Sequence, residues 1–287
     1  MRLTAVFLSL FVGASAVAAD KPLDSHGRTQ ADYDKKVAAV KKIAPAGFTV
    51  IVKAPFVVAG DDEPERVKMF ADRTIAWAVE KLKKEYFEKD PEKIITVWLF
   101  KDKESYDKHT RALFNDNPST PYGYYSPRHD ALIMNIATGG GTLVHEIVHP
   151  FIAANFEHCP PWLNEGLGSL YEQSAERNGR IVGLTNWRLA GLQRAIKNDK
   201  TITFKKLCGL DHEAFYGENS GLHYAQARYL CCYLQEKGLL QKFYRAAVAN
   251  AEKDPGGYNA LVETLGEKDM ADFEARWTKW VLTLTFP

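Results

Sequence analysis

The stretch TGGGTLVHEIVHPF, residues 138–151, contains two histidines four positions apart and a glutamate directly after the first of them. Residues four apart lie on the same face of a helix, so His145 and His149 can direct their imidazole rings at one point. The apolar residues around them recur at helical spacing and are Leu143, Val144, Ile147, Val148, Phe151 and Ile152. The stretch therefore predicts a half-buried helix that presents His145, Glu146 and His149 to a cleft.

Zinc hydrolases use the spacing His-Glu-x-x-His to hold a metal ion and a base on one helix. Glu146 lies one position after the first histidine, where its carboxylate would reach a water molecule at the metal without binding the metal itself. The motif alone is suggestive rather than decisive, because a catalytic zinc ion takes three protein ligands and a water molecule. The candidate site therefore needs a third ligand from elsewhere in the chain.

The segment CPPWLNEGLGSLYE, residues 159–172, supplies a carboxylate for that position. Its two prolines favour a helix start, and Glu165 lies early in the predicted helix, opposite the apolar stripe. Glu165 follows His149 by sixteen residues, which gives room for the first helix to end and for the second to return antiparallel to it. Three small residues would let the two helices approach closely, namely Gly166, Gly168 and Ser169.

HEIVH followed by WLNEG resembles the gluzincin branch of zinc metallopeptidases, and most closely the secreted peptidase-MA-like proteins, in which an HExxH helix precedes a W-L-x-E-G helix. The resemblance covers residues 122–233, and the paired motif is far more specific than HExxH alone. It implies a zincin-like α+β fold with one zinc ion per chain, held by His145, His149 and Glu165. It also implies that Glu146 is the general base.

The resemblance implies two further features of the site. An extended peptide substrate would bind by β-augmentation along the strand just before the HExxH helix, residues 131–136. The donor that stabilises the oxyanion in gluzincins, a tyrosine or a histidine, comes from a helix well downstream. The segment SGLHYAQARYLCCYL, residues 220–234, contains Tyr224 and its neighbour His223. Tyr224 is preferred, although the apolar pattern around it also fits a tyrosine of the core.

Two other side chains, Glu157 and His158, are rival third ligands. A metzincin-like arrangement would place a histidine six residues after the second histidine and a glycine three residues before that one. Asn155 and Ile152 occupy these positions. Glu165 therefore remains the preferred third ligand.

The chain departs from the gluzincin pattern at two positions. Pro150 directly follows the second histidine and deprives the carbonyl group of Glu146 of its helical donor, so the helix should kink or end there. Thermolysin-like proteins carry an acidic residue four positions after the third ligand, where this chain has Ser169. Glu172, one turn further along, is therefore the candidate to orient a histidine.

These residues together imply hydrolysis of a peptide bond without a covalent intermediate. Glu146 would take a proton from water and return it to the leaving nitrogen, while Tyr224 or His223 supports the oxyanion. The chain has no GxMEN-type element for a free N-terminus, which favours an endopeptidase over an aminopeptidase. Two alternatives stay open: a catalytically silent binding protein with the gluzincin fold, and a zinc hydrolase of a non-peptide amide such as a cell-wall component.

Residues 47–287 are predicted to form one catalytic unit with a cleft between two halves. The first half, 47–156, is predicted to mix strands and helices: one or two strands within 47–60, a helix from Pro64, a buried strand at 94–100, a helix at 103–114 and a hairpin within 121–136. The second half, 157–287, is predicted to be helical. From residue 142 onward the predicted helices are 142–155, 161–175, 185–198, 222–236, 238–250 and 268–283.

The first nineteen residues combine Arg2, a short apolar run and small residues, which is typical of a secretory signal peptide cleaved after Ala18 or Ala19. They predict a secreted or periplasmic protein, in which residues 20–46 form a polar N-terminal lead. Without Arg2, 36 basic side chains face 36 acidic ones. This balance predicts neither a nucleic-acid partner nor, after cleavage, a membrane partner.

All four cysteines lie beyond the predicted leader, at Cys159, Cys208, Cys231 and Cys232. Export would permit disulfide bonds in any of three pairings. Adjacent cysteines bond each other poorly, so we expect one or both of Cys231 and Cys232 to reach Cys208 or Cys159. Free thiols with a packing role are the alternative.

Overall fold

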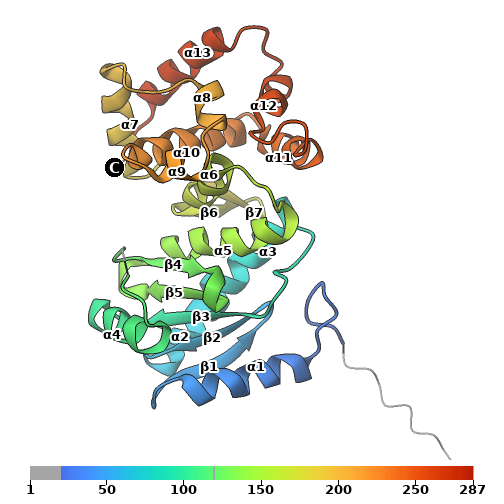
Figure 1. The fold of residues 1–287 in the computed structure, drawn as a ribbon, viewed down its shortest axis with the longest axis vertical. Coiled ribbons are helices and arrows are strands. Elements are labelled where there is room, and N and C mark those ends of the chain that lie inside the picture. The colour runs from blue at the N-terminus through green and yellow to red at the C-terminus, as the bar shows by residue number, and fades with distance from the viewer. Residues whose placement is uncertain (1–20, 119, 287) are drawn as a thin grey trace, which may run out of the picture.

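The computed structural model describes residues 21–118 and 120–286 (Figure 1), so the predicted leader lies outside the described residues. Within these residues the chain contains both helices and a five-stranded sheet, which confirms the prediction of an α+β protein. None of the described helices combines the length and the apolar character needed to cross a membrane.

The sheet has the strand order β1-β2-β3-β5-β4. The central strands β2, β3 and β5 run parallel, and the two edge strands run antiparallel to their neighbours. The strands are β1 (Thr49–Lys53), β2 (Phe56–Gly60), β3 (Ile95–Phe100), β4 (Gly123–Ser126) and β5 (Ala131–Asn135). Every residue of the central strands is buried, which is the pattern of parallel strands covered on both faces.

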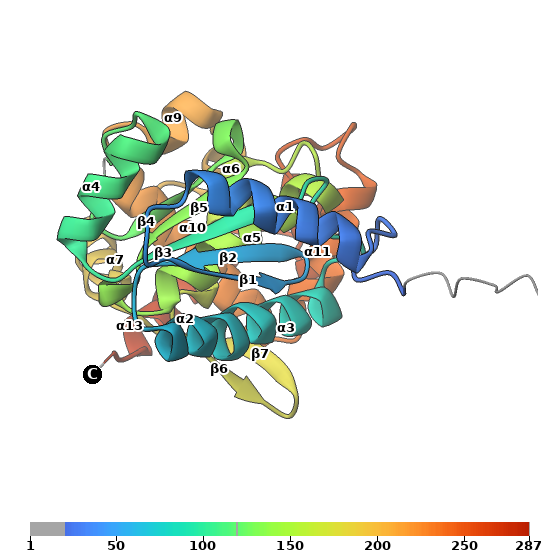
Figure 2. The same ribbon diagram turned by 90° about the horizontal axis from the view of Figure 1, so that it is seen from below.

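Helices cover both faces of this sheet. One face carries α1 (Gln30–Ile43) and α4 (Lys103–Phe114), and the other carries α2 (Pro64–Phe70), a π-helical segment (Ala71–Ala76), α3 (Trp77–Glu85) and α5 (Gly141–Asn155). Successive residues of β2 alternate between two cores: Phe56 and Val58 pack with α5, whereas Val57 and Ala59 pack with α1. Figure 2 shows α1 lying across its face of the sheet.

Residues 20–46, predicted as a polar lead, contain a helix that belongs to the sheet half. Tyr33 and Val40 of α1 are buried against the sheet. The loop before α1 is tied to the loop before β3, where the backbone amide of Ser25 donates to Asp90 at 2.7 Å. The helix escaped prediction because only these two apolar side chains of α1 are buried among many charged ones.

The predicted elements of the sheet half are confirmed. Of the one or two strands predicted within 47–60, two form, a helix begins at Pro64, and α4 has the predicted bounds. The predicted hairpin also forms: β4 and β5 pair antiparallel around a short turn at Pro127–His129. The helix that carries the histidines does not end at Pro150 but continues to Asn155.

The remaining residues form the helical half, which stacks on the sheet half with α5 and α6 at the junction (Figure 1). Its elements are α6 (Pro161–Tyr171), β6 (Ser174–Arg177), β7 (Arg180–Gly183), α7 (Arg188–Lys197), α8 (Phe204–Cys208), α9 (His212–Tyr216), α10 (Ser220–Glu236), α11 (Leu240–Ala249), α12 (Tyr258–Leu265) and α13 (Met270–Thr283). Helix α6 ends before the predicted residue 175, because the chain turns there into the β6–β7 hairpin. The short helices α8, α9 and α12 and this hairpin were not predicted.

All four cysteines are free thiols, so the expected disulfide bonds are not formed. Cys208, Cys231 and Cys232 are buried in the larger core. Burial raises the pKa of Cys232 to about 11, which keeps its thiol protonated at neutral pH. The packing role is therefore the one that the structure supports.

Candidate metal centre

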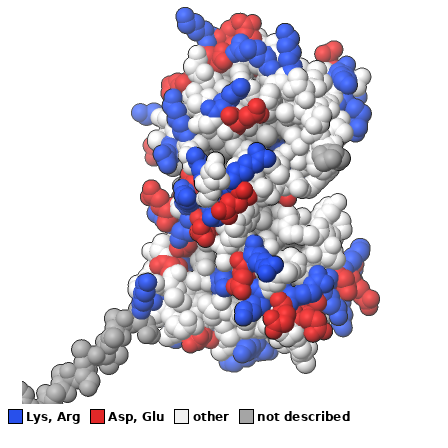
Figure 3. Space-filling view, turned by 180° about the vertical axis from the view of Figure 1, so that it is seen from behind, with Lys and Arg blue, Asp and Glu red and all other residues white. Residues whose placement is uncertain are grey.

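The predicted cleft between the halves contains a cavity of about 1200 Å³. Its walls come from β4 and α5 of the sheet half and from α6, α9 and α10 of the helical half. On the face shown in Figure 3 the surface is indented between the two halves, and most atoms at this indentation are uncharged. The cavity itself contains charged side chains, among them Glu146, Glu165, Glu172 and Arg188.

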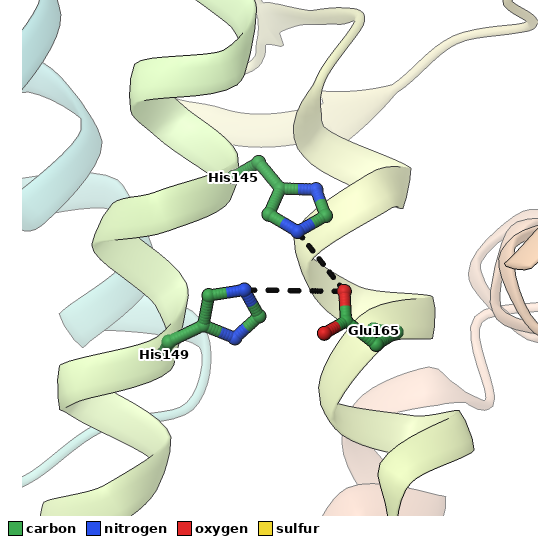
Figure 4. A group of neighbouring side chains, drawn as sticks. All are labelled: His145, His149 and Glu165. Atoms are coloured by element: carbon green, nitrogen blue, oxygen red, sulfur yellow. Dashed lines mark hydrogen bonds and ion pairs between the residues drawn. The ribbon is translucent and has the colours of Figure 1, made fainter. Parts of the chain in front are cut away.

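Three side chains from α5 and α6 converge in this cavity (Figure 4). The Oε2 atom of Glu165 lies 3.0 Å from Nε2 of His145 and 3.9 Å from Nε2 of His149. All three candidate ligand atoms lie within 4.8 Å of one another. Tetrahedral zinc with bonds of the usual length keeps its ligand atoms about 3.3 Å apart. Two imidazoles and one carboxylate at this spacing fit a single zinc ion.

The far side of each imidazole ring is fixed by a hydrogen bond. Nδ1 of His145 donates to Oε1 of Glu172 at 3.0 Å, as predicted for a residue that orients a histidine. Nδ1 of His149 donates to Oδ1 of Asn164 at 2.9 Å. Such contacts fix the tautomer and the ring orientation of a metal-binding histidine. Both rings are therefore held with Nε2 on the side that faces Glu165.

Glu172 is itself held by neighbours from outside the two motifs. Nη2 of Arg188 donates to it at 2.8 Å and Nδ2 of Asn186 at 3.1 Å. Burial alone would raise the pKa of Glu172, but the hydrogen bonds from His145 and Arg188 outweigh burial and hold the pKa at about 2. Glu172 is therefore ionised and can pair with a charged imidazole.

The charges of the three candidate ligands are strongly coupled. Burial alone would lower the pKa of His145, but hydrogen bonds to Glu165 and Glu172 raise it well above its usual value. Burial alone would raise the pKa of Glu165, but the charge of His149 and the hydrogen bond from His145 bring it down to about 2. The site thus stabilises positive charge between buried carboxylates, which is the environment that a metal cation requires.

Glu146 lies beside the candidate ligands without joining them. Its Oε2 accepts a hydrogen bond of 2.9 Å from the backbone amide of Tyr125 and lies 3.7 Å from Nε2 of His149. Burial raises the pKa of Glu146 above its usual value. A carboxylate with a raised pKa is a better proton acceptor near neutral pH, which suits the predicted role of general base.

The close approach of α5 and α6 depends on one of the three small residues. A Cβ atom on Gly168 would lie 3.0 to 3.1 Å from the imidazole ring of His145. Gly166 instead faces α10, where a Cβ atom would lie 2.9 Å from Sγ of Cys231. Ser169 is buried, and its hydroxyl donates to the carbonyl oxygen of Glu165. Only Gly168 therefore serves the contact with the histidine helix.

The two predicted oxyanion donors lie in different places. Tyr224 lines the cavity, and the guanidinium of Arg188 lies 5.1 Å from the centre of its ring. His223 is buried and is not part of the cavity wall, because its Nδ1 atom pairs with the backbone carbonyl oxygen of Phe215 at 2.9 Å. Of the two, Tyr224 is therefore the residue whose side chain faces the cavity.

The rival third ligands, Glu157 and His158, are exposed in the loop after α5 and do not belong to the cluster. Several side chains and one backbone amide of the site were not predicted: Tyr125, Asn164, Asn186, Arg188 and Tyr216. Asn164 lies within the WLNEG motif, directly before Glu165. Of these residues it is therefore the one that the sequence itself places next to a candidate ligand. The others come from separate elements that only the fold brings together.

The strand predicted to bind an extended substrate cannot do so. Residues 131–135 form β5, which pairs with β3 on one side and with β4 on the other. The free edge of the sheet beside the cavity belongs to β4 instead. The amide of Tyr125 points out of the sheet there, because it donates to Glu146 rather than to β5.

Comparison with known proteins adds no relative to this picture. No family model matches the chain, and no curated protein matches its sequence. The assignment of the site therefore rests on the convergence of the three candidate ligands and on the contacts that fix them.

Proposed function

We propose that the protein is a secreted, gluzincin-type zinc peptidase in which His145, His149 and Glu165 hold one zinc ion. The observation that carries this proposal is the convergence of their Nε2, Nε2 and Oε2 atoms within 4.8 Å. It is supported by the hydrogen bonds that fix the far side of each histidine ring. Ordinary helix packing does not require buried histidines and carboxylates to be held in this arrangement.

The residues around the ligands divide the work of hydrolysis. A bound zinc ion supplies a Lewis acid that polarises a carbonyl group and lowers the pKa of water. Glu146, whose pKa is raised by burial, would take a proton from the attacking water and deliver it to the leaving nitrogen. Tyr224 donates a hydrogen bond to the oxyanion. Because water would be the nucleophile, its oxygen would form the new C–O bond before the C–N bond breaks, and no covalent intermediate with the protein is needed.

The substrate is an extended peptide bound along the free edge of β4. This edge lines the cavity beside Glu146, whose carboxylate already accepts the hydrogen bond from the amide of Tyr125 on the side of the strand that faces away from β5. A peptide that adds to a sheet edge gains backbone hydrogen bonds that do not depend on its side chains. An internal segment of a polypeptide can bind in this way, which favours an endopeptidase.

The test uses the chain from residue 20, loaded with zinc and given peptides with blocked ends. We expect internal cleavage by the wild-type protein and a rate at least about 100-fold lower for Glu146→Gln, because a general base contributes about that much. Zinc content should be the same in both. Glu104→Gln, which changes an exposed glutamate outside the cavity, is the matched control and should cleave normally.

Each other result would count against the proposal. Normal cleavage by Glu146→Gln would remove the assigned base. Zinc bound without any cleavage would favour a binding protein that has kept the site. Cleavage confined to non-peptide amides would retain the zinc chemistry but reject the peptidase.

A further inference from the structure

The third candidate ligand has one oxygen that does not face the histidines. Oε2 of Glu165 lies between the two imidazole rings, whereas Oε1 accepts a hydrogen bond of 2.5 Å from the hydroxyl of Tyr216. The Glu165 side chain is only 6% exposed. We propose that Tyr216 is a positioning residue that restricts Glu165 to binding the metal through Oε2 alone. This inference rests on the metal site of the proposed function.

The number of carboxylate oxygens on the metal affects how freely water or substrate can reach it. A carboxylate binds a cation through one oxygen or through both. A catalytic zinc site keeps one position free for water or substrate beside its three protein ligands. If both oxygens of Glu165 approached the metal, the second would compete for that position. A phenol that donates to Oε1 holds this oxygen away from it.

Tyr216 is fixed by its own neighbours. It is the last residue of α9, which begins where the side chain of Asp211 accepts a hydrogen bond from the amide of Ala214. The preceding residue, Phe215, is fully buried. The ring of Tyr216 lies 4.5 Å from that of His212, measured between ring centres. The hydroxyl therefore reaches Glu165 from a short helix that is anchored at both ends.

His223 helps to hold the segment that carries Tyr216. Its ring pairs with the carbonyl oxygen of Phe215, the residue directly before Tyr216. Two neighbours on α10 therefore have different tasks: Tyr224 lines the cavity, and His223 ties down the segment that carries Tyr216.

Tyr216 completes a regular pattern around the site. Each of the three candidate ligands directs one atom inward and has its other polar atom held by a partner. The partners are Glu172 for His145, Asn164 for His149 and Tyr216 for Glu165. Contacts of this kind orient the ligands, and their loss usually costs a factor of 10 to 100 in metal affinity or activity.

The test compares Tyr216→Phe with the wild-type protein after replacement of zinc by cobalt(II), whose visible absorption depends on its coordination number. We expect a changed spectrum for Tyr216→Phe and a zinc affinity about tenfold lower, measured by competition with a chelator. Tyr244→Phe is the matched control: it removes a buried hydroxyl that has no partner among the described residues. It should leave both the spectrum and the affinity unchanged.

The outcomes separate this inference from the proposal on which it rests. An unchanged spectrum and affinity in Tyr216→Phe, with metal bound to the wild-type protein, would overturn only the role of Tyr216. Absence of metal binding by the wild-type protein would overturn both. Circular dichroism shows whether each variant is folded, and because Tyr216 is partly exposed, removal of its hydroxyl should not prevent folding.

Discussion

The two halves of the molecule contribute to the candidate site in different ways. The sheet half supplies His145, Glu146 and His149 from little more than one turn of α5. The helical half supplies Glu165 and most of the groups that fix the ligands, from α6, α7, α9 and the turns between them. One half therefore provides a local motif, and the other provides the long-range contacts that make the motif a site.

The largest expected effect comes from the far face of the sheet half and concerns stability alone. Trp98 is buried between the sheet, α1 and α4, on the face opposite α5. Trp98→Ala should reduce the free energy of unfolding by about 3 to 5 kcal/mol, because it leaves a large cavity in this core. Urea denaturation measures the loss, and zinc titration of the folded variant should give the wild-type affinity. A weaker zinc affinity would show that the two faces are coupled.

The next largest effect tests the helical half at Glu172. Glu172→Gln should lower zinc affinity by about 10- to 100-fold, because a neutral amide pairs less strongly with the ring of His145 and with Arg188. Glu218→Gln, an exposed glutamate, is the matched control. Equal affinities in the two variants would mean that Glu172 has no part in orienting His145.

The smallest effect tests the contact between the two halves through a pair of glycines on α6. Gly168→Ala places a methyl group against the ring of His145, and Gly166→Ala places one against Cys231 on α10. Both should cost about 1 to 3 kcal/mol of stability through overpacking. Only Gly168→Ala should also lower zinc affinity, as a chelator titration would measure. Similar affinities in both variants would argue against a contact specific to His145.

The sheet half was the more predictable one from sequence, and its helix α5 shows why. The helical spacing of the apolar residues around His145 and His149 is a local pattern. It predicts that the two histidines lie away from the core, and both line the cavity. The pattern of β5 was equally clear, yet its predicted role was wrong. A strand is visible in the sequence, whereas its neighbours in the sheet are not, and β4 rather than β5 has the free edge.

The contacts of the helical half could not be predicted for a related reason. Tyr216 lies 51 residues after Glu165, in a helix too short to show a periodic pattern. Sequence alone left Tyr224 and His223 as alternatives, because neighbours on a helix point in different directions that depend on packing. Glu172 was predicted because it lies on the same helical segment as the third ligand, two turns further on.

The claim that both halves hold one metal ion is tested most directly by elemental analysis. The chain from residue 20 would be reconstituted with zinc and compared with His149→Ala from the sheet half and Glu165→Ala from the helical half. We predict about one zinc ion per wild-type chain and its loss in both variants. Zinc retained by Glu165→Ala, or no zinc in the wild-type protein, would contradict a site shared between the two halves.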